Sequence, residues 1–256
     1  MFNRFKDFIP VIVLLIVSVL IPIEQGLSEE IVRQTLIIGR NQFYQTRYYI
    51  FDSNEPGPVV LLEAGVHGDE VAGVYALEEI VPKIKVYSGK LIILPRMNPP
   101  ALQISRRYFN MDMNRIFPGL PNAFPYEYHL AWEIYHMLQK EGVEYVLSLH
   151  ESRNLHSPCR PKTFGQTIVY GVLPPPRLLW GWLQEVNKNL DYDEKFCEYY
   201  APQDYGATDV FVRQLRLKAA FAVETWRHFD LLRRIELQKL VFLTFLKQVG
   251  MRFSVK

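Results

Sequence analysis

The sequence of 256 residues has little net charge, few cysteines, no internal repeat and no low-complexity tract. A net charge of +2 without a Lys/Arg-rich block gives no reason to expect nucleic-acid binding. The two cysteines, Cys159 and Cys197, could form a disulfide in an exported protein or remain two free thiols. The length suits one sizeable domain and is too short for two large ones.

Long hydrophobic runs are also rare, with one exception near the N-terminus. Residues 8–23 form an uncharged run of sixteen residues behind Arg4 and Lys6, which is the layout of a secretory signal. The run is shorter than the roughly twenty residues of a comfortable membrane span. We expect residues 1–28 to be a signal peptide or a membrane anchor and the protein to be exported. A buried N-terminal helix is the alternative.

Apolar segments typical of strands alternate with segments typical of helices along the rest of the chain. Strands are expected at residues 35–39, 47–52, 59–64, 90–95, 145–149, 166–171 and 219–223, and helices at residues 71–80, 127–140, 176–189, 204–217 and 229–249. This alternation predicts a single α/β domain over residues 32–250, with a mixed, mostly parallel central β-sheet flanked by helices. Residues 98–125 are polar and rich in proline, and so long a loop is usually functional.

Chemically useful side chains follow three of the predicted strands. His67 and Glu70 follow one strand at once, and His150 and Glu224 follow two others. The carboxyl ends of strands are where open α/β sheets place their active sites. Two histidines and a glutamate suit a catalytic zinc ion with an open position for water, and Glu224 is the candidate base. The simpler alternatives are a loop hydrogen bond for His150 and a salt bridge from Glu224 to Arg227.

The loop at residues 105–119 holds three arginines, one aspartate and two asparagines. A solvated basic loop is the simplest interpretation. Beside a zinc site, however, an arginine could stabilise a developing oxyanion, and an Asn-Arg pair could bind a carboxylate through forked hydrogen bonds.

These segments belong to a motif series with a known order. The series is His67-Gly68-Asp69-Glu70, Asn98-Pro99, Arg107-Tyr108, Asp112 to Phe117, Leu149-His150 and Glu224-Thr225. Through it, residues 58–226 resemble the succinylglutamate desuccinylase/aspartoacylase family, a branch of the zinc carboxypeptidase superfamily. The resemblance implies a zinc carboxypeptidase-like (phosphorylase/hydrolase-like) fold.

The resemblance also implies the metal site. His67, Glu70 and His150 would bind one zinc ion per chain. Asp112 matches a position that hydrogen-bonds a ligand histidine, here expected to be His67, and such a contact orients the ring and raises its basicity.

Further roles follow from the same resemblance. Arg107 would polarise the scissile carbonyl, and Asn114 and Arg115 would hold the substrate carboxylate. Glu224 would serve as general base and then as general acid. Arg106 is adjacent to Arg107, but the spacing to Asn114 favours Arg107.

A tyrosine that closes over the substrate is common in the wider superfamily. Tyr200 and Tyr205 are the candidates, and packing is the alternative role for either ring.

Together these features predict a zinc hydrolase that cleaves an N-acyl amide bond next to a free carboxylate, in a small acyl-amino acid or a peptide. An exported metallocarboxypeptidase acting on peptides such as peptidoglycan stems is the first alternative. A non-catalytic zinc- or ligand-binding module is the second. Aspartoacylases carry a β-rich domain after the catalytic glutamate, whereas thirty-two residues follow Glu224 here. We therefore expect an open cleft and a larger substrate.

Overall fold

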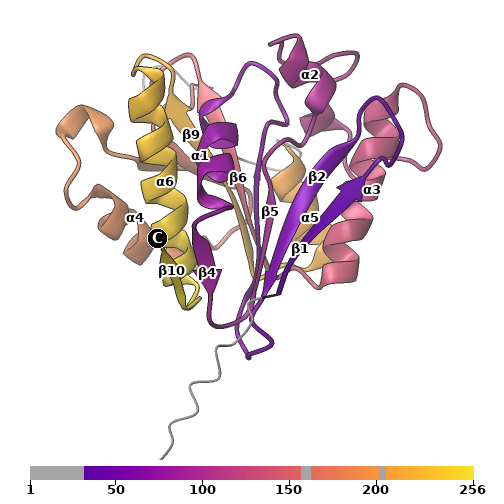
Figure 1. Cartoon of the computed structure of the whole chain (residues 1–256). Coiled ribbons are helices and arrows are strands. Elements are labelled where there is room, and N and C mark those ends of the chain that lie inside the picture. Colours follow the sequence, from indigo (N-terminus) through magenta and orange to yellow (C-terminus); the bar gives the residue numbers. More distant parts are fainter. Residues whose placement is uncertain (1–31, 157–162, 202–205) are drawn as a thin grey trace, which may run out of the picture. The chain divides into compact units, whose positions relative to one another are not determined.

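The computed structural model describes residues 32–156, 163–201 and 206–256, and residues 31–256 form one compact unit. Its centre is an eight-stranded sheet with the order β1-β2-β5-β3-β6-β9-β7-β8 (Figure 1). The strands are β1 (Val32–Ile38), β2 (Thr46–Asp52), β3 (Val59–Ala64), β5 (Lys90–Leu94), β6 (Tyr145–Ser152), β7 (Thr167–Tyr170), β8 (Cys197–Tyr200) and β9 (Ala219–Trp226). The four adjacent strands β5, β3, β6 and β9 run parallel, whereas β1–β2, β2–β5 and β7–β9 are antiparallel pairs. The predicted mixed, mostly parallel sheet in a single domain is confirmed.

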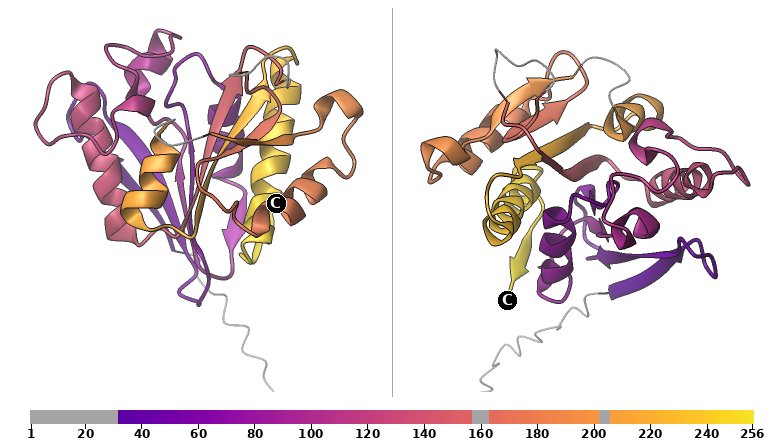
Figure 2. Two further views of the ribbon diagram at one scale, coloured as in Figure 1. Left: turned by 180° about the vertical axis from the view of Figure 1, so that it is seen from behind. Right: turned by 90° about the horizontal axis from the view of Figure 1, so that it is seen from above.

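Helices cover both faces of this sheet. They are α1 (Ala72–Ile80), α2 (Pro99–Gln103), α3 (Tyr126–Glu141), α4 (Leu178–Asn187), α5 (Ala207–Leu215) and α6 (Leu231–Gln248). Helices α1, α4 and α6 lie on one face, and α3 and α5 lie on the other (Figure 2). Each face has its own cluster of buried apolar side chains. The central strands are therefore buried on both sides, which explains why their sequences are continuously apolar.

The alternation of side chains along a strand places the polar residues on one face. On β9, Phe221 and Val223 pack under α1, α4 and α6, whereas Ala220 packs on the opposite side. Glu224 therefore faces the side of α3 and α5, and the same alternation on β6 places His150 there.

Two strands are longer than predicted. β6 continues to Ser152 and β9 to Trp226, so His150 and Glu224 lie within strands rather than after them. The reason is that the parallel ladder between β6 and β9 persists through both residues. The short strands β4 (Ile84–Val86), β8 and β10 (Phe253–Val255) were not predicted, and neither was α2 within the expected loop.

Among the helices in the described part of the chain, none is both long and apolar enough to cross a lipid bilayer. Residues 1–28, which contain the predicted signal or anchor, lie outside the described residues, as do Cys159 and Tyr205.

Candidate metal centre and active site

The turn after β3 is shaped by two glycines. Gly65 has a φ of +75°, a left-handed conformation that glycine adopts at little cost. A Cβ atom on Gly68 would come within 1.9 Å of the carbonyl oxygen of Ala101, so the turn packs directly on the backbone of α2. This close packing fixes the turn that carries His67 and Glu70.

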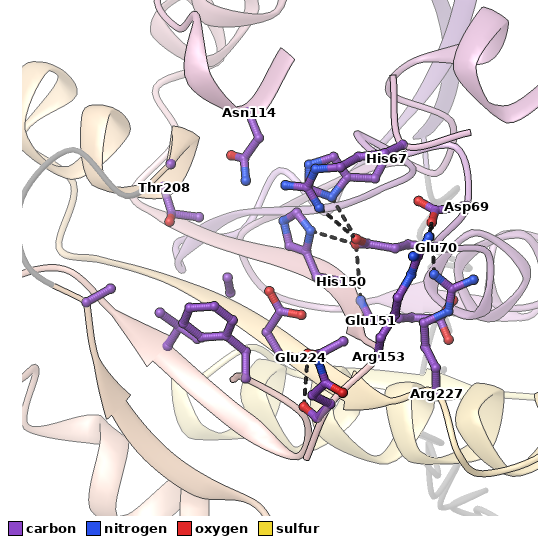
Figure 3. Close-up of a pocket in the computed structure, with 18 of the residues that line it drawn as sticks. His67, Asp69, Glu70, Asn114, His150, Glu151, Arg153, Thr208, Glu224 and Arg227 are labelled. Carbon is purple, nitrogen blue, oxygen red and sulfur yellow. Dashed lines mark hydrogen bonds and ion pairs between the residues drawn. The ribbon is translucent and has the colours of Figure 1, made fainter. Parts of the chain in front are cut away.

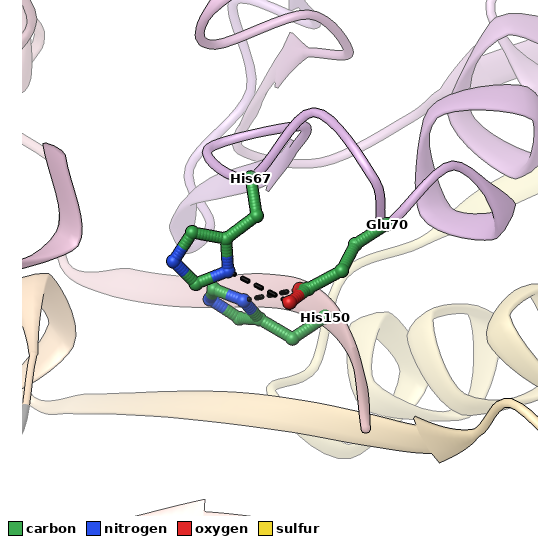
Figure 4. A group of neighbouring side chains, drawn as sticks. All are labelled: His67, Glu70 and His150. Atoms are coloured by element: carbon green, nitrogen blue, oxygen red, sulfur yellow. Dashed lines mark hydrogen bonds and ion pairs between the residues drawn. The ribbon is translucent and has the colours of Figure 1, made fainter. Parts of the chain in front are cut away.

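The turn and β6 bring His67, Glu70 and His150 together in a buried cluster (Figure 4). One potential ligand atom from each residue lies within 4.8 Å of the others. The Nδ1 atom of His67 is 2.8 Å from one Glu70 oxygen, and the Nδ1 atom of His150 is 2.9 Å from the other. Three ligand-type atoms thus converge on one point.

The outer ring nitrogens of both histidines have partners of their own. Nε2 of His67 lies 3.2 Å from Asp112 Oδ1, and Nε2 of His150 lies 3.0 Å from Ser148 Oγ. When each Nε2–H donates to its oxygen partner, both Nδ1 lone pairs remain free for a metal ion. The donor set therefore fits a divalent cation such as zinc with an open coordination position. Ser148 was missed in the sequence, although it lies two residues before His150 and so faces the same side.

Electrostatics in the cluster agree with a cation site. Burial opposes the charge of Glu70, but the two imidazoles outweigh it and hold its pKa well below the usual range. Burial also lowers the pKa of His67, yet Glu70 and Asp112 outweigh this and raise it to about 9. The pKa of His150 is lowered, mainly by burial. A proton on His67 therefore balances the carboxylate when no metal ion is bound.

Arg107 lies at the edge of the cluster. Its Nε donates to Asp112 Oδ2 at 3.1 Å, and its Nη1 is 3.6 Å from Glu70 Oε1. Arg107 lines the cavity beside the cluster, whereas Arg106 is not among the described residues that line it.

Asn114 and Arg115 line the same cavity from the short 3-10 helix η1 (Met113–Arg115). The side-chain oxygen of Asn114 accepts a hydrogen bond from the backbone of Ala207, at the start of α5 (2.7 Å). A Cβ atom on Gly206 would lie 2.9 Å from this amide. Close packing against the start of α5 therefore positions the side chain of Asn114.

Glu224 lies opposite His150 in the parallel ladder, and its carboxylate points into the cavity that His150 and Glu70 border (Figure 3). Burial and the negative charge of Glu70 raise the pKa of Glu224 well above its ordinary value. A cation held by the neighbouring cluster would oppose this shift by stabilising the carboxylate. Glu224 is therefore placed to exchange a proton close to the metal site.

The cavity has a volume of about 400 Å³ and extends past the cluster to a second polar group. There, Arg153 and Arg227 both contact Asp69. The ion pair of Arg227 in the described structure is thus with Asp69 and not with Glu224. No role was predicted for Asp69 or Arg153. A usable signal was present, because Arg153 and Arg227 follow His150 and Glu224 at the same spacing of three residues.

The structure does not bring Tyr200 into the cavity. Its ring lies at the end of β8, with its centroid 5.6 Å from that of Tyr170, and it is not among the described residues that line the cavity. Cys197 is partly buried on β8.

Comparison with known proteins shows which proteins the chain resembles. Residues 56–159 match the model of the succinylglutamate desuccinylase/aspartoacylase catalytic domain. The chain is 42% identical over 72 residues to N-alpha-acetyl-L-2,4-diaminobutyric acid deacetylase of Halomonas elongata, covering 26% of this chain and 21% of that protein. It is 24% identical over 141 residues to succinylglutamate desuccinylase of Yersinia pseudotuberculosis, covering 50% and 41%. The matches thus span less than half the length of these relatives.

Solved structures share the fold. The product-bound cell shape determinant protein Csd4 of Helicobacter pylori has a TM-score of 0.71 at 22% identity, covering 81% of this chain and 56% of that chain. An aspartoacylase family protein of Mesorhizobium loti has a TM-score of 0.64 at 18% identity, covering 88% and 68%.

The fold and the cluster define an α/β protein of the kind found in deacylases and carboxypeptidase-like hydrolases, with a candidate metal centre at the carboxyl ends of its central strands. Within this class, the chain is similar to the succinylglutamate desuccinylase/aspartoacylase family, whose catalytic-domain model matches residues 56–159.

Proposed function

We propose that the chain is a zinc-dependent hydrolase that cleaves an amide bond next to a free carboxylate, as in an N-acyl amino acid. The observation that carries this proposal is the convergence of the His67–Glu70–His150 cluster and Glu224 on one cavity. Relatives that are named as a deacetylase and a desuccinylase support it.

Glu224 and Arg107 each have a step in this reaction. A bound zinc ion would supply Lewis-acid activation of water and of the scissile carbonyl. Glu224 takes a proton from the water whose oxygen adds to the acyl carbon, and it gives that proton to the amine nitrogen as the C–N bond breaks. Arg107 donates to the carbonyl oxygen as negative charge develops on it. The products are a carboxylate and a free amine.

Asn114 and Arg115 would hold the substrate carboxylate. A guanidinium and an amide side by side can bind both oxygens of a carboxylate. Because α5 fixes Asn114, the carboxylate would be held at a constant place relative to the cluster. This contact requires a free carboxylate next to the scissile bond.

A carboxypeptidase is the second candidate. Csd4, whose fold is similar, is described as a D,L-carboxypeptidase and is seen bound to mDAP. The Asn-Arg pair would bind the C-terminus of a peptide as well as it binds an amino acid. With export, a peptidoglycan stem peptide becomes a plausible substrate. A non-catalytic zinc-binding module is disfavoured because Arg107 and Glu224 both border the cluster.

Export remains part of the proposal. It is supported by the basic residues and the uncharged run at residues 8–23. Fractionation of cells that produce the full chain, with N-terminal sequencing, would distinguish a cleaved signal from a retained anchor; wholly cytosolic protein with an intact N-terminus contradicts export.

A substrate panel tests the proposed reaction. The zinc-loaded full chain is expected to hydrolyse N-acyl amino acids, and the Glu224→Gln variant to lose about 10²- to 10⁴-fold in kcat while it keeps its zinc. Activity confined to short peptides with free C-termini would favour the carboxypeptidase. Normal turnover by Glu224→Gln would remove Glu224 from the mechanism.

A further inference from the structure

A second cavity lies where the turn between β1 and β2 meets the loop that leads into α3 (Figure 1). Its volume is about 580 Å³, within the roughly 300–1,000 Å³ of typical small-ligand sites. The described residues that line it lie within residues 42–44, 109–110 and 122–129, and none of them lines the cavity beside the metal cluster. The proposed hydrolysis therefore gives this second cavity no role.

Aromatic rings form much of the wall of the second cavity. Tyr44 and Tyr126 are buried and stacked, with their ring centroids 5.1 Å apart, and Phe43 packs edge-on against Tyr126 at 4.9 Å. The hydroxyl of Tyr126 donates to Oδ1 of Asn98 (2.6 Å). These contacts hold the wall in one arrangement before any ligand binds, which reduces the entropic cost of binding.

Two of the rings remain open to solvent. Phe43 is 68% exposed and Phe124 is 91% exposed. A phenylalanine with so little burial adds almost nothing to the hydrophobic core. Exposed apolar side chains that gather around a hollow usually mark a binding site. The rings of Phe43 and Phe124 are therefore available to a ligand.

Apart from the two tyrosines, the polar side chains of the second cavity are three amides and one imidazole. They are Gln42, Asn110, Asn122 and His129, and no Asp, Glu, Lys or Arg is among the described residues of the lining. The side-chain amides of Gln42 and Asn122 form no hydrogen bond within the described part of the chain. Nδ1 of His129 accepts from the backbone N–H of Asn122 (2.9 Å), so a neutral ring carries its proton on Nε2. The cavity thus offers uncharged donors and acceptors.

Rings and neutral amides together suit a saccharide. The C–H groups on the face of a pyranose ring pack on the negative face of an aromatic ring. Its hydroxyls both donate and accept hydrogen bonds, as a planar amide does. An ionic ligand would need a charged partner, which the described lining lacks. A purely apolar partner would bury the amides of Gln42 and Asn122 without hydrogen bonds, which is unfavourable.

We propose that the second cavity binds a neutral oligosaccharide of β-linked gluco-configured rings, which carry C–H groups on both faces. Phe43 and Phe124 stack on the sugar rings, and Gln42 and Asn122 bind hydroxyl groups. This inference goes beyond the proposed amide hydrolysis and does not depend on it. The loop of residues 107–112 borders both the metal cluster and the second cavity, so a bound sugar would lie beside a loop of the active site.

Titration of the full chain with cellotriose and with N-acetylated chitotriose, followed by calorimetry and saturation-transfer NMR, tests this site. We expect at least one of the two to bind with a millimolar or lower dissociation constant. Phe124→Ala should weaken this binding by about tenfold or more. Because Phe124 is almost fully exposed, the variant should fold normally, which circular dichroism and thermal unfolding check.

Two further variants make the test specific. Gln42→Ala should weaken the same binding by at least about threefold, because it removes a hydrogen bond to the sugar. Tyr192→Ala is the matched control, since this tyrosine is 93% exposed on the 3-10 helix η2 (Tyr192–Glu194) and is not among the described residues of either cavity. The control should bind both sugars like the unaltered protein.

Several results would overturn the proposal. These are no binding of either sugar at millimolar concentration, and binding that survives Phe124→Ala or Gln42→Ala. Binding that disappears when a chelator removes zinc would place the sugar in the hydrolase site instead. Phosphatidylcholine vesicles that sediment with the full chain but not with Phe124→Ala, without any sugar binding, would assign the exposed rings to a membrane surface.

Discussion

Two buried glutamates at β3 have pKa values shifted in opposite directions. Glu70 follows the strand and meets an imidazole nitrogen at each oxygen, and its pKa is lowered. Glu63 lies within the strand and is 1% exposed, and its Oε2 has no hydrogen-bond partner among the described residues. Burial raises the pKa of Glu63 to about 7, and a hydrogen bond from Ser148 offsets only part of this. Similar burial thus favours the charged form at one position and the protonated form at the other, because the partners differ.

This contrast bears on function. The negative charge of Glu70 favours a bound cation, which can take the place of the proton shared with its histidine partners. Glu63 has no cationic partner among the described residues, so its ionisation destabilises the folded state. Ser148 connects the two regions, since it contacts Glu63 and also His150. A change at Glu70 should therefore alter the metal affinity, and a change at Glu63 should alter the pH dependence of stability. A change at Ser148 should alter both.

The largest effect is expected from Glu70→Gln. Gln supplies no anionic oxygen, so the affinity for zinc should fall by about a thousandfold or more, which corresponds to about 4 kcal/mol. Competition with a fluorescent chelator measures this loss. Glu224→Gln is the matched control in the same cavity and should change the affinity by less than about tenfold. An unchanged affinity in Glu70→Gln would show that the metal lies elsewhere.

The next effect concerns Glu63. Its folded-state pKa of about 7 exceeds that of an ordinary glutamate, so between these values the folded state binds more protons than the unfolded state. The free energy of unfolding therefore falls as pH rises from about 4.5 to 7, by roughly 3 kcal/mol in total, and stays reduced above pH 7. Glu63→Gln should raise the free energy of unfolding at pH 8 by about 2–3 kcal/mol and change it by less than about 1 kcal/mol at pH 5.

Urea unfolding of metal-free protein at the two pH values checks this prediction. Glu55→Gln, at an exposed carboxylate in the turn after β2, controls for the loss of a charge. Equal effects of Glu63→Gln at pH 5 and pH 8 would mean that Glu63 ionises normally.

The sequence predicted much of the fold because the central strands are buried on both faces and therefore continuously apolar. The prediction placed His150 and Glu224 just past their strands, because the apolar pattern that marked each strand ends before these polar residues. The backbone ladder does not depend on polarity and continues through both residues. Short strands such as β4 have too few residues to show a period, and β10, its partner, lies at the far end of the chain.

The site was partly accessible from the sequence for a similar reason. Residues in the family motifs could be matched one by one, whereas the shared contact of Arg153 and Arg227 with Asp69 depends on the pairing of β3, β6 and β9. Glu63 could not be foreseen either, because one glutamate in an apolar strand does not reveal its partners. Tyr200 illustrates the converse, since a residue type expected near a site can pack elsewhere.

The smallest effect is expected from Ser148→Ala. A serine hydroxyl has a single proton, so if it donates to Glu63 it accepts from Nε2–H of His150, and this keeps the Nδ1 atom of His150 free for the metal. Removing the hydroxyl should weaken zinc binding by about tenfold, the lower end of what such contacts usually contribute. It should also raise the pKa of Glu63 further, so that the loss of stability between pH 5 and pH 8 shifts to higher pH. Chelator competition and urea unfolding measure the two effects on one protein. A weaker metal site with an unshifted pH profile would mean that Ser148 serves His150 alone.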